Sequence, residues 1–232
     1  MKEFRTRDGP YPIRLTYETA EIDAICEDAL RKSGRLPAEP KPIEIDRFLE
    51  KFFEVRVVYD DLGEGAIGCT VFNRKGRVTG FLISTSIEAD GTKSGRRRAR
   101  ATLAHEGGHG LLHPRLFMED ASTGSLFGET RDESPRILCR DQDVGPVGAK
   151  ATYSGRWWEW QANRAIGGLL LPRKLVTTAI SGMLNREKMV HVLPDDKRNE
   201  AEAFTAETFD VNPAVARIRL HEMFPVSQQI SF

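Results

Sequence analysis

Two histidines and a glutamate near the middle of the chain have types and spacing that suit a metal site. The segment reads His105-Glu106-Gly107-Gly108-His109, an HExxH pattern. On an α-helix, residues four positions apart lie on one face about one turn apart, so both imidazoles can reach a single zinc ion. Glu106 lies beside that face, where it can take a proton from a water molecule at the metal. The pattern therefore predicts a zinc centre that activates water.

The surroundings of the pattern favour a metal site over an exposed polar helix. Ala101, Leu103 and Ala104 precede it, and Leu111 and Leu112 follow it. Polar groups in such an apolar setting usually need a metal or a partner, because burying an unpaired charge is costly.

Three glycines in the same predicted helix need a separate explanation. A glycine inside a helix costs about 1 kcal/mol relative to alanine, so helix stability does not explain Gly107, Gly108 and the nearby Gly110. Either a neighbouring element packs closely against them, or they leave room for a substrate over the metal. We expect close packing.

A catalytic zinc ion needs a third protein ligand and keeps one position open for water. His113 is the nearest candidate, but three histidines at i, i+4 and i+8 extend about 12 Å along the axis and cannot converge on one ion. We expect His113 on the helix surface or just outside the ligands. Glu159 is the better ligand, since it is the only carboxylate in the segment WWEWQAN, 157–163. Asn163, one turn later, can hydrogen-bond a ligand or cap the neighbouring turn.

The elements that must position these side chains are helices and a small group of strands. Apolar periodicity, capping signals and β-branched alternation predict them. The predicted helices span 17–33, 43–53, about 95–113, 156–170, 198–207 and 213–223. The predicted strands span 53–60, 66–73 and 80–86, with a possible one at 136–140 in the poorly patterned stretch 114–155. Helices, a three-stranded antiparallel meander and further helices suggest an α+β fold.

Composition excludes several classes of protein. The chain has 232 residues with Lys+Arg and Asp+Glu at 34 each, so it lacks the basic excess typical of nucleic-acid-binding domains. The amino end has no apolar signal segment, and no apolar run reaches the roughly 18–20 residues of a membrane span. Three cysteines without a CxxC pair favour reduced thiols, and Cys139 is expected to be a buried small residue rather than a ligand. We expect a cytoplasmic protein without direct contact to nucleic acid or membrane.

Two segments resemble the ImmA/IrrE family of zinc metallopeptidases. TLAHEGGHGLLH is similar to the family's AHExGH helix, and EWQANRAIGGLLLP is similar to its later ExxAN helix ending in LLMP. The resemblance covers about 98–113 and 156–172 and is weaker in the tail. The residues that it assigns to one Zn²⁺ ion per chain and to catalysis are His105, His109 and Glu159 as ligands and Glu106 as the catalytic residue.

The resemblance also implies an architecture. It predicts a mostly helical zincin of the gluzincin type, with a small sheet of about three strands, over residues 1–195. A helix-turn-helix-like pair packed on this domain is expected over 196–232. The chain departs from the family at Leu171, where methionine is usual, and in a longer spacer that indicates an insertion within 114–155.

The function implied by the resemblance is a regulatory endopeptidase in the cytoplasm of a bacterium, phage or mobile element. Its substrate would be a helix-turn-helix transcriptional repressor cleaved in response to stress. Two alternatives stay open: a zinc-bearing module that holds a repressor or DNA without cutting it, and a broad housekeeping peptidase. Glu106 favours cleavage, since a scaffold needs no base beside its metal.

Two features outside the two motifs, a run of arginines and the strand at 80–86, each allow more than one interpretation. Four positive charges, on Arg96, Arg97, Arg98 and Arg100, lie near the start of the predicted helix, where they oppose its dipole. These side chains could contact a carboxylate, a substrate or nucleic acid. We expect them to be solvated instead. The strand at 80–86 is either an edge that pairs with an extended peptide or an interior strand.

Two further groups of residues are weak candidates for function. Tyr153 and His191 are the nearest donors that could stabilise an oxyanion beside the metal. In the tail, Arg217 and Arg219 are the only basic residues of a possible reading face, so we expect the helix pair to pack on the core.

Overall fold

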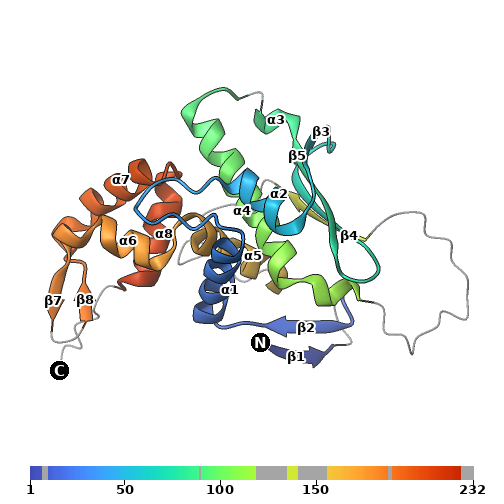
Figure 1. The fold of residues 1–232 in the computed structure, drawn as a ribbon, viewed down its shortest axis with the longest axis horizontal. Helices are drawn as coiled ribbons and strands as arrows, with labels where there is room; N and C mark the ends of the chain where they lie inside the picture. Colours follow the sequence, from blue (N-terminus) through green and yellow to red (C-terminus); the bar gives the residue numbers. More distant parts are fainter. Residues whose placement is uncertain (7–9, 89, 119–134, 141–155, 188–189, 226–232) are drawn as a thin grey trace, which may run out of the picture.

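Helix α4 (Lys93–Leu112) carries the HExxH pattern and forms the centre of the fold. In the computed structural model it lies between a small sheet and helix α5 (Trp157–Leu170), so that different faces of one helix meet the two layers (Figure 1). The fold mixes helices and strands, as the sequence predicts. The structure describes the whole chain except residues 7–9, 89, 119–134, 141–155, 188–189 and 226–232.

The predicted helices are all present, and their ends differ from the prediction by at most two residues. Besides α4 and α5 they are α1 (Thr19–Lys32), α2 (Ile45–Phe53), α7 (Arg198–Thr208) and α8 (Pro213–Met223). Shorter elements were not predicted, because three to seven residues show too little periodicity. They are β1 (Lys2–Arg5), β2 (Ile13–Thr16), α3 (Thr85–Glu88), α6 (Arg173–Ala179), β7 (Asn185–Glu187), β8 (Val190–Val192) and the 3₁₀ turns Pro114–Phe117, Ser181–Met183 and Asp195–Lys197.

The sheet beside α4 has the described strand order β3–β5–β4–β6. Its strands are β3 (Val57–Asp60), β4 (Ala66–Phe72), β5 (Val78–Ser84) and β6 (Arg136–Arg140). β4 and β5 form the expected antiparallel hairpin, but β3 pairs with β5 in parallel and β6 adds to β4 as a fourth strand. The predicted three-stranded meander is therefore wrong, because alternation identifies strands but not the edges that they join.

The strand predicted at 80–86 lies in the interior of this sheet. β5 is hydrogen-bonded to β3 on one side and to β4 on the other, so both of its edges are occupied. An extended peptide cannot add to it. Among the described strands of this sheet, β3 and β6 form the edges.

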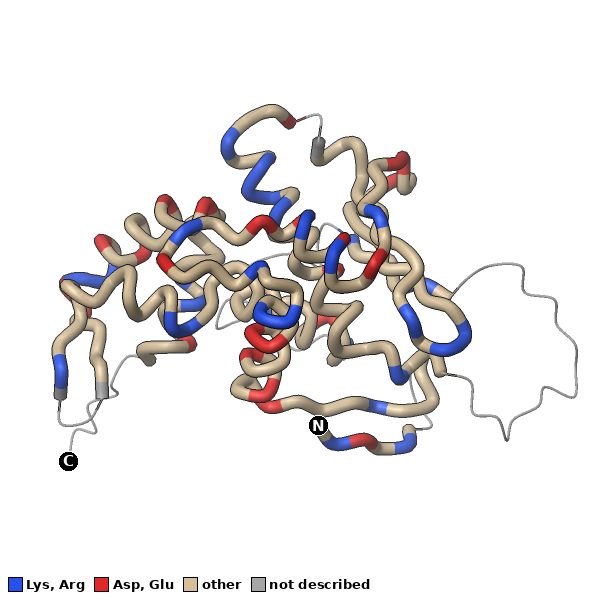
Figure 2. Tube along the Cα trace, viewed as in Figure 1, with Lys and Arg blue, Asp and Glu red and all other residues tan. Residues whose placement is uncertain are grey.

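Arginines fix the first turns of α4 to the C-terminal helices. Arg97 is only 6% exposed; its Nε donates to Asp210 Oδ1 at 2.9 Å and its Nη2 donates to Glu207 Oε1 at 3.0 Å. Arg100 Nε donates to the carbonyl of Asp210 at 3.0 Å. The expectation of a solvated run is wrong for these two side chains, because their charge at the helix start is offset by acceptors from α7 and the turn after it. Figure 2 shows this run of positive residues at the start of α4.

The C-terminal helices α7 and α8 pack on the rest of the fold, with α8 against α5. Asn212 begins α8 by accepting a hydrogen bond from the Ala214 amide at 3.0 Å. Arg219 is 1% exposed; its Nε donates to the Leu171 carbonyl at 3.0 Å, and its Nη1 lies 2.8 Å from Asp23 Oδ1. Arg219 is therefore unavailable to a DNA-reading face.

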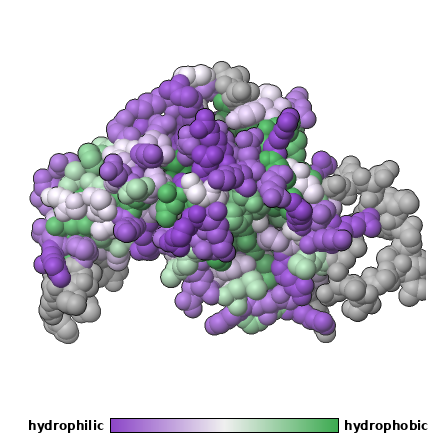
Figure 3. All heavy atoms as spheres, viewed as in Figure 1, coloured by the Kyte–Doolittle hydropathy of each residue, from purple (hydrophilic) through white to green (hydrophobic). Residues whose placement is uncertain are grey.

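Polar residues cover most of the face shown in Figure 3, and the apolar areas on that face are separated from one another. Among the residues that the structure describes, the large apolar side chains that are exposed are Met1, Phe4, Val58, Tyr59, Met118, Leu138 and Phe204. Within the described ranges, no helix combines the length and the apolar character needed to cross a bilayer.

Candidate metal centre

Three side chains from two helices converge where α4 packs on α5. His105 Nε2 lies 3.0 Å from His109 Nε2 and 3.0 Å from Glu159 Oε2, and His109 Nε2 lies 3.5 Å from the same carboxylate oxygen. Both histidines are fully buried, and Glu159 is 6% exposed. The structure thus brings together the three residues that the sequence predicted as ligands.

These separations match those of ligand atoms around one ion. In a tetrahedral site with bonds of about 2.0–2.1 Å, neighbouring ligand atoms lie about 3.3 Å apart. The separations of 3.0, 3.0 and 3.5 Å fall on either side of that value. Three protein ligands of this kind leave a fourth position for water, which is the arrangement of a catalytic rather than a structural zinc ion.

A chain of hydrogen bonds sets the protonation of His109. Gln161 Nε2 donates to the Leu15 carbonyl at 2.7 Å, so Gln161 Oε1 is the atom that faces His113. His113 Nε2 must donate to that oxygen, 3.0 Å away, and burial lowers the pKa of His113 well below its usual range, which keeps a lone pair on its Nδ1. His109 Nδ1 donates to this lone pair across 3.0 Å. His109 Nε2 is therefore unprotonated where it faces the other two ligand atoms.

His105 is held in the same way by the next turn of α5. Asn163 Oδ1 accepts a hydrogen bond from His105 Nδ1 at 3.1 Å, so the neutral His105 ring carries its lone pair on Nε2. Burial alone would lower the pKa of His105, but the Glu159 carboxylate outweighs burial and raises it. Burial would likewise raise the pKa of Glu159, but His109 and His105 hold it well below its usual range.

When both histidines are neutral, three acceptor atoms therefore face one another, and the carboxylate of Glu159 favours a positive charge among them. Two imidazole lone pairs and a carboxylate oxygen at 3.0 to 3.5 Å repel each other unless a cation lies between them. A single proton satisfies only one such pair, whereas a divalent ion satisfies all three. Zinc favours two imidazoles and a carboxylate, so the residues present fit a zinc ion.

Glu106 lies on the side of α4 that faces the sheet. Thr70 Oγ1 on β4 donates to Glu106 Oε2 at 2.5 Å, whereas Oε1 is buried without a hydrogen-bond partner among the described residues. Gly68 of β4 lies against the same carboxylate, and a Cβ at that position would collide with Oε1. Burial raises the pKa of Glu106 to about 7, which suits a group that accepts and returns a proton near neutral pH.

Close packing explains the glycines of α4, as the sequence predicts. An added Cβ at each of them would meet a side chain of a neighbouring helix. These contacts would be Gly107 with Leu49 at 2.7 Å, Gly108 with Ala165 at 2.7 Å and Gly110 with Phe53 at 2.8 Å. Gly108 allows α5 to approach α4 closely enough for Glu159 to reach both histidines.

The remaining predicted residues have different outcomes. His113 is fully buried and hydrogen-bonded to His109, so it lies just outside the ligands and not on the helix surface. His191 is exposed on β8, in a hairpin far from the C-terminal half of α4, so its prediction as an oxyanion donor is wrong (Figure 1). Tyr153 lies outside the described residues. Cys139 is buried on β6 with its Sγ within 4.8 Å of ligand atoms of His105 and Glu106.

Several residues of the site were not identified from the sequence. Gln161 lies two positions before Asn163 in the second motif, so its polar side chain in an apolar helix was a usable signal. Thr70 has no such signal, because an isolated threonine is ordinary in a strand. Tyr11 also lies near the site: it packs edge-on against Trp158, and burial together with the charge of Glu159 raises its pKa to about 12.

Comparison with known proteins gave no match: no protein-family model fits the chain, and no curated protein is similar to it.

Proposed function

We propose that this chain is a zinc-dependent endopeptidase of the ImmA/IrrE type with a zincin fold. The observation that carries the proposal is the convergence of His105 Nε2, His109 Nε2 and Glu159 Oε2 within 3.5 Å, beside a buried carboxylate. A purely structural metal site would need neither the open fourth position nor an additional acid with a bare oxygen.

Different residues would bind the metal and transfer the proton during hydrolysis. His105, His109 and Glu159 would hold the zinc ion, which when bound supplies a Lewis acid that polarises a carbonyl and makes water more acidic. Glu106 Oε1 accepts the proton of the attacking water and returns it to the leaving amine. Thr70 holds the other oxygen of that carboxylate, so the bare oxygen keeps its orientation.

The substrate that we propose is a helix-turn-helix transcriptional repressor in a bacterial or phage cytoplasm. This part of the proposal is supported by the likeness of TLAHEGGHGLLH and EWQANRAIGGLLLP to the ImmA/IrrE motifs. We propose no direct binding of nucleic acid, in keeping with the zero net charge and the burial of Arg219.

A second candidate function is a zinc-bearing module that holds a repressor without cutting it. The observation that favours it is the complete burial of Glu106, whose carboxylate a peptide reaches only if a neighbouring element moves. The two functions share the metal and the partner but differ in turnover.

The test uses Glu106→Gln protein as bait in extract of the source cells, followed by incubation of each captured protein with zinc-loaded wild type. Capture of a repressor that wild type cuts at one position supports the peptidase. A captured repressor that stays whole with zinc present supports the binding module instead. Exposed Glu50→Gln on α2 is the control bait, and it should retain cleavage and release its partner.

A further inference from the structure

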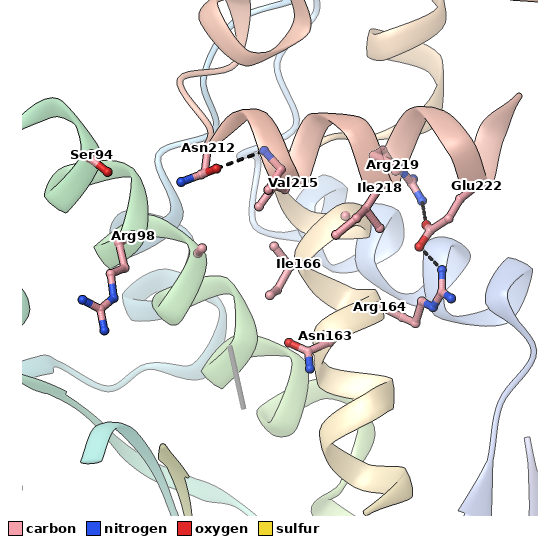
Figure 4. A pocket seen from close by; sticks show the side chains of 13 residues that line it. Ser94, Arg98, Asn163, Arg164, Ile166, Asn212, Val215, Ile218, Arg219 and Glu222 are labelled. Atoms are coloured by element: carbon pink, nitrogen blue, oxygen red, sulfur yellow. Dashed lines mark hydrogen bonds and ion pairs between the residues drawn. The ribbon is translucent and has the colours of Figure 1, made fainter. Parts of the chain in front are cut away.

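A cavity of about 260 Å³ lies between α4, α5 and α8 (Figure 4). Its walls are mainly apolar, with Ala101 from α4, Ile166 from α5, and Val215 and Ile218 from α8. Helix α8 carries none of the residues of the metal site.

This cavity begins directly behind the metal residues. Asn163 lines it, and the Oδ1 of the same side chain accepts the hydrogen bond from His105 Nδ1 at 3.1 Å. Ala101 lies about one turn before His105 on α4, and Ile166 lies about one turn after Asn163 on α5. The metal ligands and the cavity therefore occupy successive levels of one helix–helix interface.

The charged groups of the cavity are largely neutralised at the end near α8. Arg164 and the buried Arg219 both pair with Glu222 (Figure 4). Arg219 also pairs with Asp23. A charged side chain entering at that end would compete with these pairs and lose its hydration. An uncharged apolar side chain would replace water against Ile166, Val215 and Ile218 without disturbing them.

We propose that this cavity receives a large apolar side chain of the substrate, of the size of leucine, methionine or phenylalanine, next to the cleaved bond. The proposal rests on the proposed peptidase function. Enzymes select their substrates through pockets close to the reacting atoms. Asn163 lines this cavity and is hydrogen-bonded at 3.1 Å to Nδ1 of the metal-site residue His105.

The proposal gives the C-terminal helix a role in specificity. Val215 and Ile218 of α8 line the cavity and do not belong to the metal site (Figure 4), so replacing them changes the space for a side chain without replacing a metal-site residue. The C-terminal pair would then select the substrate residue as well as complete the core.

The first test measures cleavage of a peptide library by zinc-loaded wild type, Val215→Phe and the control Ala203→Phe, which adds the same ring to an exposed position on α7. Wild type should prefer leucine, methionine or phenylalanine at one position beside the cut. Val215→Phe should lower kcat/KM for those peptides at least about tenfold relative to alanine peptides, whereas Ala203→Phe should not. Cleavage with the same preference in Val215→Phe as in wild type overturns the proposal and leaves the peptidase function intact.

The second test does not depend on turnover. Ligand-observed NMR compares binding of N-acetyl-leucinamide and N-acetyl-alaninamide to Glu106→Gln, with and without Val215→Phe. The leucine probe should bind to Glu106→Gln alone, and the alanine probe to neither. Absence of leucine binding, or equal binding after Val215→Phe, counts against the cavity. A wild type that cleaves no peptide counts against the proposed function, and the proposal of a substrate pocket falls with it.

Discussion

The two glutamates on opposite sides of helix α4 have opposite electrostatic environments. On the α5 side, Glu159 lies within 3.5 Å of two imidazole nitrogens, and these hold its pKa well below the usual range. On the sheet side, Glu106 receives one hydrogen bond from Thr70, and burial raises its pKa to about 7. Two glutamates, each with a carboxylate oxygen within 4.8 Å of a ring nitrogen of His105, thus have environments that suit different tasks.

The environment of a carboxylate, and not its residue type, therefore decides whether it can serve as ligand or base. A permanent anion among cation-binding groups suits a metal ligand. A carboxylate whose protonated and charged forms are close in energy suits proton transfer. The HExxH spacing delivers both environments, because His105 and Glu106 point to neighbouring faces of one helix.

The largest expected effect comes from removing the base alone. Glu106→Gln keeps the shape of the side chain but cannot accept a proton, so kcat should fall about 10²- to 10⁴-fold. Zinc content should stay at the wild-type level, because the α5 side of α4 is untouched. Stopped-time cleavage assays and elemental analysis check the two quantities on the same sample. Loss of zinc, or undiminished cleavage, would refute the division of roles.

Removing Glu159, on the α5 side of α4, should lower the zinc content as well as the turnover. Glu159→Ala leaves two unprotonated histidines without the carboxylate, so purified protein should contain much less zinc than wild type, and cleavage should fall in proportion to the zinc. The exposed Glu50→Ala on α2 is the control and should keep its zinc. Equal zinc content in Glu159→Ala and wild type would remove Glu159 from the ligand set.

The sequence predicted the contacts between residues that are close together in the chain, but not those between residues that are far apart. The spacing of His105 and His109 is local, and one helical turn suffices to align them. Helix positions were predictable for the same reason, since capping and periodicity are local signals. The pairing of β6 with β4 was not predictable, because the alternation of apolar residues in a strand does not indicate which distant strand pairs with it.

The partners of charged residues show the same limit. Arg97 donates a hydrogen bond to Asp210, more than a hundred positions later, and Gln161 donates one to the Leu15 carbonyl, almost 150 positions earlier. No short motif encodes such contacts. The sequence therefore predicted the residues that converge, and with Asn163 one of the groups that orient them, but not the Leu15 carbonyl or Thr70.

The hydrogen-bond chain behind His109 can be tested by breaking it at Gln161. Gln161→Leu leaves His113 Nε2 without its acceptor, so His113 no longer presents a fixed lone pair to His109. Zinc affinity should fall about 10- to 100-fold, as for other residues that orient metal ligands. Competition with a chromophoric chelator measures it. Asn199→Leu, an exposed amide on α7, is the control. Unchanged affinity in Gln161→Leu would mean that packing alone orients His109.

The smallest expected effect is on the sheet side, at the hydroxyl that holds Glu106. Thr70→Val keeps the volume of the side chain but removes its donor, so the charged carboxylate loses one hydrogen bond and kcat should fall about tenfold. Thr70→Ser restores the donor and should restore most of the turnover, and zinc content should be the same in all three proteins. Loss of zinc in Thr70→Val would show that the sheet supports the whole of α4 instead of the base alone. Loss of turnover with zinc retained would place the sheet side of α4 in proton transfer and leave metal binding to the α5 side.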